Sequence, residues 1–239
     1  MSGGPTASLD LTHVLYDDTS HLSLGLALIT LSPILLMASY AALAVQTREI
    51  TIITMWAGQL ACEGFNWILK RAIKQERPVE SLGNGYGFPS SHSQYMGYFA
   101  AFLFCHMYFR HRFESSGYPM LDAAWRGLVY TAIGAWSLAV PYSRYHLQYH
   151  TPFQILCGYF IGVFLGLALY LVAEYIPRYH PQSLLGRLKG GVLCGQVATW
   201  CRIRDGWGVW ADGGREQEWV RWRAEWETQQ ATHLKDKKQ

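Results

Sequence analysis

The sequence predicts an all-α membrane protein: a polytopic transmembrane helix bundle of about five spans, followed by a polar cytosolic C-terminal tail. Half of the 239 residues are apolar and 15% are aromatic, but only 15% are charged. A soluble domain usually carries about 25% charged residues. Long apolar runs fill residues 22–176, whereas residues 177–239 are charged and rich in Trp. We therefore expect a non-cytosolic segment at 1–21, a transmembrane domain at 22–176 and a cytosolic tail at 177–239.

Five apolar runs are candidates for helices that cross the bilayer. A helix needs roughly 20 apolar residues to cross about 30 Å of hydrocarbon. The candidate runs are Leu22–Gln46, Thr51–Leu69, His92–Phe109, Leu128–Tyr142 and Pro152–Ile176. The second run has polar interruptions, and the fourth reaches across only with Trp125 and its neighbours. The first twenty residues lack the basic start and apolar centre of a cleavable signal peptide, so the first run is expected to remain as a span.

The basic residues near the ends of the spans predict the orientation. The loop Arg110–Arg126, the tail from Arg178 onward and the short turn at Arg48 should face the cytosol. The N-terminus and the loops 71–91 and 144–151 should then lie together on the other side. The five cysteines form no C-x-x-C pair and have no spacing typical of metal ligands, so small packed apolar side chains are their simplest interpretation.

Three polar clusters fall on the predicted non-cytosolic side, at Lys70–Pro78, Pro89–Gln94 and Ser143–His150. Each has a plain structural explanation when it is taken alone. The first is a basic collar at a helix end. In the second, Ser91 and Gln94 have the spacing of a capping box. The third contains a histidine in a loop, which alone indicates nothing.

Together, the three clusters offer the groups that phosphoryl transfer needs. The set comprises three cations, neutral donors at a helix N-terminus and two histidines: Lys70, Arg77, Arg144, Ser90, Ser91, His92 and His150. Fixed donors and cations stabilise the charge on a transferring phosphoryl group. One histidine can attack phosphorus in line while the other protonates the leaving oxygen. This scheme requires no metal and no cofactor, because the cations are side chains and no carboxylate pair is present.

The spacing within the clusters resembles the three-part signature of the type 2 phosphatidic acid phosphatase superfamily. The parts are K-x6-R-P at 70–78, P-S-x-H at 89–92 and S-R-x5-H at 143–150. The stretches KQERPV and YGFPSSHSQ resemble the dolichyldiphosphatase branch of that superfamily, and this narrower resemblance covers about residues 10–180. The resemblance implies a catalytic set in which His150 is the nucleophile that forms a phosphohistidine and His92 is the general acid and then the base. It also implies a phosphate clamp: Lys70, Arg77, Arg144, Ser90 and the Ser91 amide.

Two positions depart from the superfamily pattern. Ser91 stands where Gly is usual, and its N–H can still donate. Gln154 stands where Asp is usual; it can orient the His150 ring but supplies no negative charge. The dolichyldiphosphatase branch resembles this chain in having Gln there.

A polar stripe follows one face of the second apolar run. Gln59, Glu63, Asn66 and Lys70 are spaced by four, three and four residues, so they share one side of a helix. Such a stripe should point into the bundle. We expect Glu63 and Asn66, with Gln154, to support the site, and a purely structural polar contact is the alternative for Glu63.

The resemblance implies that the substrate is a polyisoprenoid diphosphate lipid. It also implies that the protein associates with the membrane and not with nucleic acid. It predicts hydrolysis of dolichyl diphosphate at the luminal face of the endoplasmic reticulum membrane, which recycles the lipid carrier for protein N-glycosylation. The alternatives are a broader lipid phosphate phosphatase and an inactive membrane scaffold. Residues 235–239 look like a K-x-K-x-x retrieval signal. Trp219, Trp222 and Trp226 predict an amphipathic helix that lies on the cytosolic membrane surface or packs on the bundle.

Overall fold

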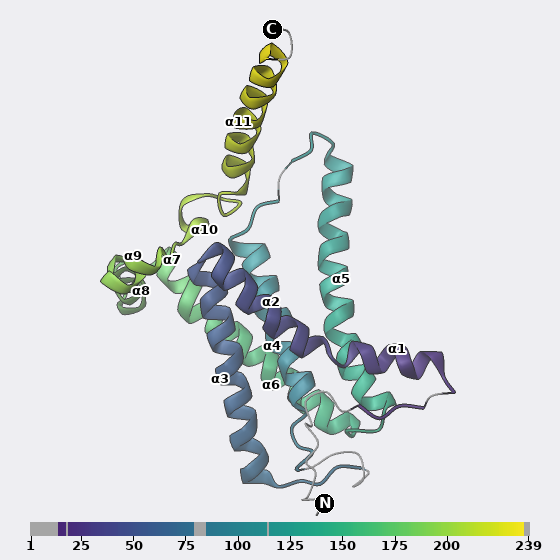
Figure 1. Cartoon of the computed structure of the whole chain (residues 1–239). Helices are drawn as coiled ribbons and strands as arrows, with labels where there is room; N and C mark the ends of the chain where they lie inside the picture. Colours follow the sequence, from purple (N-terminus) through teal and green to yellow (C-terminus); the bar gives the residue numbers. More distant parts are fainter. Residues whose placement is uncertain (1–13, 18, 79–84, 114, 237–239) are drawn as a thin grey trace, which may run out of the picture.

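The computed structural model describes residues 14–17, 19–78, 85–113 and 115–236, and within these ranges every regular element is a helix apart from one isolated bridge between Glu49 and Arg204. The elements are α1 His21–Ile29, α2 Ser32–Thr47, α3 Ile50–Ile73, α4 Ser91–Phe109, α5 Pro119–His146, α6 Pro152–Tyr170, η1 Leu171–Tyr175, α7 Ile176–Tyr179, α8 Leu184–Cys194, α9 Gln196–Cys201, α10 Gly206–Val209 and α11 Arg215–Asp236. Figure 1 shows α2 to α6 gathered in a bundle, with α11 projecting away from it. The predicted all-α class is confirmed.

Two helical stretches of the described residues are long and apolar enough to cross a membrane. They are His21–Thr47, with a mean hydropathy of 2.0, and Pro152–Tyr179, with a mean hydropathy of 2.4. The number of five spans stays a prediction. One side of α6 exposes large apolar residues along its whole length: Phe153, Leu156, Phe160, Phe164 and Leu167. Soluble monomers rarely expose so continuous an apolar surface, and contact with lipid accounts for it.

The first predicted span is not one straight helix, because it bends between α1 and α2 (Figure 1). Pro33, in the first turn of α2, has no N–H to donate to the carbonyl of Ile29. The hydroxyl of Ser32 donates to that carbonyl instead, at 2.5 Å. The indole of Trp136 in α5 donates to the same hydroxyl at 2.9 Å, which ties the bend to the bundle.

The predicted fourth and fifth spans are longer in the structure. α5 begins well before Leu128 and ends after Tyr142, and it accommodates Pro141 in its interior. α6 continues without interruption through the π-helical turn η1 into α7. The extra residue in a π turn shifts the helical register, and here it accompanies the burial of Glu174.

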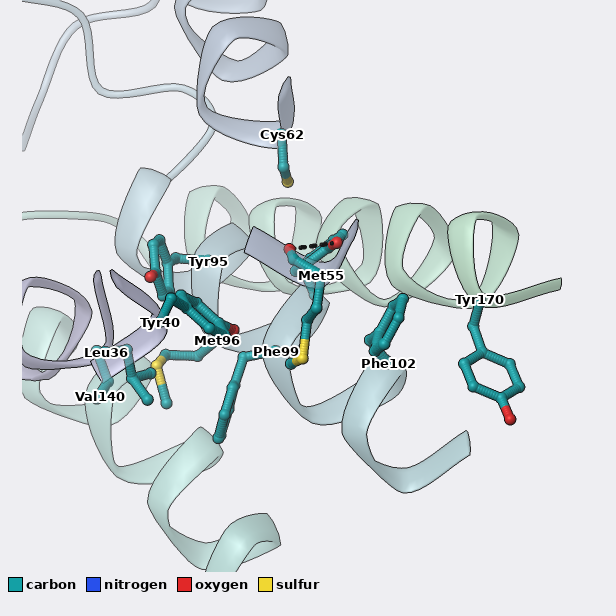
Figure 2. Close-up of a cluster of buried hydrophobic side chains, with 11 residues drawn as sticks. Leu36, Tyr40, Met55, Cys62, Tyr95, Met96, Phe99, Phe102, Val140 and Tyr170 are labelled. Carbon is teal, nitrogen blue, oxygen red and sulfur yellow. Dashed lines mark hydrogen bonds between the residues drawn. The ribbon is translucent and has the colours of Figure 1, made fainter. Parts of the chain in front are cut away.

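The core lies where α4 packs against α6, with α2, α3 and α5 around them. Its largest fully buried side chains include Tyr98, Phe102 and Tyr170, and Figure 2 shows the cluster of buried aromatic and aliphatic side chains to which they belong. α4 and α6 approach closely because glycines line the contact. A Cβ at Gly158 would lie 2.5 Å from the carbonyl oxygen of Ser90, and one at Gly162 would overlap the carbonyl of Gln94.

Buried ion pairs lie at the end of the bundle where α4 finishes. Arg110 pairs with Glu174 at 2.6 Å and with Asp205 at 2.6 Å. Lys189 of α8 pairs with the same two carboxylates, at 2.9 and 3.0 Å. Thr51 at the start of α3 donates to Glu174 at 3.0 Å. Because two cations and two carboxylates satisfy one another, this four-charge network can be buried and can join α3, α4, η1 and α8.

Replacing Gly162 by Ala should destabilise the bundle, since the new methyl group would lie 2.8 Å from the carbonyl carbon of Gln94 and would force α4 away from α6. Overpacking of this kind typically costs about 1–3 kcal/mol. We expect a lower midpoint of thermal unfolding for the detergent-solubilised protein. Gly127→Ala is the matched control, because no atom lies within 4 Å of that Cβ position. Equal midpoints for the two variants would contradict the packing argument.

Candidate functional site

The last turn of α3 and the segment after it carry the first cluster. Lys70 lies in that turn, and its ammonium donates to the Ser91 hydroxyl at the start of α4, at 3.5 Å. Lys74 ends the helix in the left-handed conformation, with φ of 53°. Beyond it, Arg77 donates through Nε to the carbonyl of Gly85 at 3.3 Å. The chain reversal therefore brings both cations toward the N-terminus of α4.

The N-terminus of α4 is capped by Ser90 and not by the predicted Ser91–Gln94 capping box. The Ser90 hydroxyl accepts from the Ser93 N–H at 3.5 Å and from the Ser93 hydroxyl at 3.0 Å. Gln94 turns into the bundle, where it accepts from Asn66 at 2.6 Å and donates to the carbonyl of Cys62 at 3.0 Å. The sequence pattern misled because a buried amide acceptor on α3 outcompetes the local backbone. The amides of Ser91 and His92, in the first helical turn, have no acceptor within the helix.

A capping box does occur at the start of α6, between Thr151 and Gln154, directly after His150. The Gln154 side-chain oxygen lies 3.2 Å from the Thr151 nitrogen and 3.2 Å from Nδ1 of His150. Its amide nitrogen donates to the carbonyl of Glu76 at 2.9 Å. The sequence contained this signal, because Thr-x-x-Gln is a capping pattern.

These contacts determine which nitrogen of His150 can react. The Glu76 carbonyl needs a donor and the Thr151 N–H needs an acceptor, so the Gln154 amide has only one favourable orientation. Its oxygen then faces Nδ1, which must carry the proton. The lone pair of the neutral imidazole is therefore on Nε2. Gly87 leaves room for this arrangement, because a Cβ there would lie 2.9 Å from both the Gln154 nitrogen and the Glu76 carbonyl oxygen.

Arg144 lies in the last turn of α5, buried beneath the loop that carries His150. It donates to the Thr30 hydroxyl at 3.3 Å, and its guanidinium carbon lies 3.7 Å from the ring centre of Tyr149. The Tyr149 hydroxyl in turn accepts from the backbone N–H of Leu15 at 2.8 Å. Sequence reasoning missed Thr30 and Tyr149. Tyr149 adjoins His150 in sequence, whereas nothing near Thr30 indicates that it contacts α5.

Members of all three clusters lie close enough together to interact electrostatically. Lys70, Arg77, Arg144 and His150 each act on His92. Burial, followed by the charges of Arg144, Arg77 and Lys70, lowers the pKa of His150 to about 3. The imidazole is therefore neutral at physiological pH, and its lone pair is available for attack.

The cations keep their charge near neutral pH despite their burial. Burial, with Arg77 close by, lowers the pKa of Lys70 to about 8, although the charge of Glu63 opposes the shift. Burial lowers the pKa of Arg144 to about 10. Within the described residues, neither Lys70 nor Arg144 has a carboxylate in ion-pair contact. A partly buried group of cations with so little compensation favours an anionic ligand.

The predicted supporting residues contact the site in different ways. Asn66 holds Gln94, and through it the first turns of α4. Glu63 is half-buried and acts on Lys70 through its charge. Gln59, from the same predicted stripe, is fully buried, and its amide has no hydrogen-bond partner among the described residues.

The arrangement can hold a phosphate group beside a neutral imidazole nucleophile. Lys70, Arg77 and Arg144 all act on both histidines, and the first-turn amides of α4 adjoin His92. His92, at the start of α4, can exchange a proton with a leaving group or with water. Within the described ranges, no three His, Cys, Asp or Glu side chains are grouped as metal ligands.

Comparison with known proteins relates the chain to a known family. The sequence profile of the PAP2 superfamily matches residues 51–178. Dolichyldiphosphatase 1 of Homo sapiens is 36% identical over 155 residues, which cover 62% of this chain and 63% of that protein. The dolichyldiphosphatase of Saccharomyces cerevisiae is 35% identical over 158 residues, 63% of each chain. A putative dolichyldiphosphatase of Neurospora crassa is 47% identical over 110 residues, 45% of this chain and 39% of the relative.

The match to these curated relatives is therefore partial, since it spans 63% of the length of the human and yeast proteins. Among solved structures, the fold is similar to the crystal structure of a transmembrane PAP2-type phosphatidylglycerolphosphate phosphatase from Bacillus subtilis. The TM-score is 0.52 at 21% identity, over 66% of this chain and 80% of the other. This likeness supports the arrangement of the helices.

The pKa of Lys70 predicts how the site binds phosphate as pH changes. Below about pH 8 the ammonium is charged and contributes to binding, and above that value the contribution is lost. We expect the dissociation constant for inorganic phosphate, measured by calorimetry, to rise by up to about tenfold per pH unit above this point. Lys70→Arg keeps its charge and should move the loss to higher pH. An unchanged pH profile in that variant would contradict the assignment.

Proposed function

Since the chain belongs to the PAP2 superfamily, we propose that it is a membrane phosphatase that hydrolyses dolichyl diphosphate to dolichyl monophosphate and phosphate. The observation that carries the proposal is His150, a buried neutral imidazole whose Nδ1 contacts the Gln154 oxygen, beside Lys70, Arg77 and Arg144. A fixed nucleophile among cations is what transfer of a phosphoryl group requires.

The reaction would proceed in two steps through a phosphohistidine. Nε2 of His150 attacks the terminal phosphorus, and the bond from that phosphorus to the bridging oxygen breaks. His92, which must take up a proton when the anionic substrate binds, gives that proton to the departing dolichyl monophosphate. In the second step, His92 takes a proton from water, and the oxygen of that water attacks the phosphorus and releases phosphate from Nε2. Lys70, Arg77, Arg144 and the first amides of α4 stabilise the charge on the transferring group in both steps.

A diphosphate suits this site because of the neutral side chain at Gln154. A carboxylate there would make the imidazole of His150 a stronger nucleophile, and an amide only orients it. The leaving group of a lipid diphosphate is a phosphate, whose second pKa is about 6. The leaving group of a lipid monophosphate is an alkoxide, which departs far less readily. The names of the relatives agree with a diphosphate substrate.

The distribution of charge supports a luminal site and a cytosolic C-terminus in the endoplasmic reticulum membrane. Basic residues are frequent in the Arg110–Arg126 loop and in the tail, at the end of the bundle opposite the site. Residues 237–239 of the proposed retrieval signal lie outside the described residues.

On α11, Trp219 and Trp222 are 54% and 53% exposed, which favours a membrane-surface helix over one packed on the bundle. Recycling of the lipid carrier for N-glycosylation would follow from these assignments.

Hydrolysis by the purified protein tests the proposed activity. Dolichyl diphosphate should release phosphate, and His150→Ala should lower the rate by about 10³-fold or more, because the nucleophile is lost. His146→Ala is the matched control, since His146 is exposed in the last turn of α5. Activity should persist in EDTA. Equal thermal unfolding midpoints would exclude misfolding, and phosphate release by a folded His150→Ala variant would contradict the proposed nucleophile.

The preference for an anhydride can be measured with two substrates that share one lipid. We expect kcat/KM for dolichyl diphosphate to exceed that for dolichyl monophosphate by about 100-fold or more, because only the leaving group differs. Comparable values would rule out the role given to Gln154 and would favour a broader lipid phosphate phosphatase. If the folded wild type hydrolyses neither substrate, the result would favour the alternative of an inactive membrane scaffold.

A further inference from the structure

The end of the bundle opposite the site carries an apolar surface that the proposed reaction does not use. We define it as the α8–α9 face, formed by Leu184, Leu188, Val192, Val197 and Trp200, which are 83%, 63%, 48%, 72% and 84% exposed. The first three are spaced by four residues, so they follow one side of α8. No residue of α8 is buried. The whole face is therefore open to contact with water or lipid around the protein.

Ion pairs hold the neighbouring side of α8 to the bundle. Lys189 reaches Glu174 at 2.9 Å and Asp205 at 3.0 Å, and its side chain is only 14% exposed. Adjacent helix positions differ by about 100° around the axis. Lys189 therefore points inward, while Leu188 points away from the network. Loss of one partner from such a buried network would leave an uncompensated charge, so the orientation of α8 is firmly held.

The same network also fixes the position of α8 along the axis of the bundle. α4 has 19 residues, Ser91–Phe109. At 1.5 Å per residue, this length is about 28 Å, close to the roughly 30 Å of a hydrocarbon core. The phosphate site lies at the first residues of α4, and Arg110 directly follows its last. The ion pairs of Arg110 thus hold α8 about one bilayer thickness from the site, beside the end of α7 (Figure 1).

From this orientation and level, we propose that the α8–α9 face is seated in the lipid leaflet opposite the site, as an anchor that lies in the plane of the membrane. Arg187 and Arg202 are exposed near the face and can reach lipid phosphates. Trp200 has the amphipathic ring that suits the membrane interface. A bilayer surface supplies both the acyl chains and the anionic headgroups that these residues match. The proposal does not depend on the substrate of the site.

Fluorescence of the full chain in lipid nanodiscs tests the proposal. The signal of Trp200 is the difference between the wild type and Trp200→Phe, so the other tryptophans cancel. In phosphatidylcholine and phosphatidylserine nanodiscs with brominated acyl chains, we expect the Trp200 signal to fall at least about twofold. Aqueous iodide should leave it nearly unchanged, because the ring is covered by lipid.

Charge on the face provides a second variant. Because the ion pairs hold α8 in place, Leu188→Glu should draw water onto the face, so that Trp200 becomes quenched more by iodide and less by bromine, whereas Leu188→Met should behave as the wild type. A wild-type Trp200 that iodide quenches and brominated lipid does not would overturn the proposal. Protection from both quenchers would also overturn it, since a second copy or a protein contact would then cover the face. Sedimentation would distinguish those two.

Discussion

The close approach of α4 and α6 is the constraint on which the arrangement of the site depends. Ser90 and Gly158 meet at the end of this contact, where a Cβ at Gly158 would lie 2.5 Å from the Ser90 carbonyl. In the same place, the Ser90 N–H donates to the carbonyl of Gln154 at 3.2 Å. The helix that carries His92 in its first turn is therefore joined to the helix that follows His150. Two histidines from segments far apart in sequence keep a defined relation because backbone packs on backbone, without a flexible side chain between them.

The convergence of the three clusters could be predicted because each adjoins a long apolar run. Runs that cross a layer in alternating directions bring the end of the second, the start of the third and the end of the fourth to one side. The orienting contact of Gln154 was also predictable from its spacing to His150. Its second bond, to the carbonyl of Glu76, was not, because no pattern reports where a loop carbonyl will lie.

Other features that the sequence did not predict also depend on contacts between different helices. The capping-box spacing of Ser91 and Gln94, the plain structural explanation of that cluster, forms no such cap because Asn66 and the Cys62 carbonyl, on another helix, offer Gln94 buried partners. The bend between α1 and α2 is explained locally by Pro33, but its attachment to Trp136 depends on the tertiary fold. Local sequence therefore indicates where an element begins and ends, and long-range packing decides which partner a polar side chain takes.

The two ends of α4 differ in charge balance, and this has a consequence for the membrane that the protein can occupy. At one end Arg110 is neutralised by Glu174 and Asp205, and at the other a cationic pocket needs water or an anion. In the proposed membrane arrangement neither end can be drawn into hydrocarbon, so α4 would not slide along the membrane normal. A bilayer much thicker than α4 would then have to thin around the protein, at a cost of fractions of a kcal/mol per Å of mismatch. On that arrangement, the length of one helix would make the protein sensitive to hydrophobic mismatch and would favour thin membranes over thick ones.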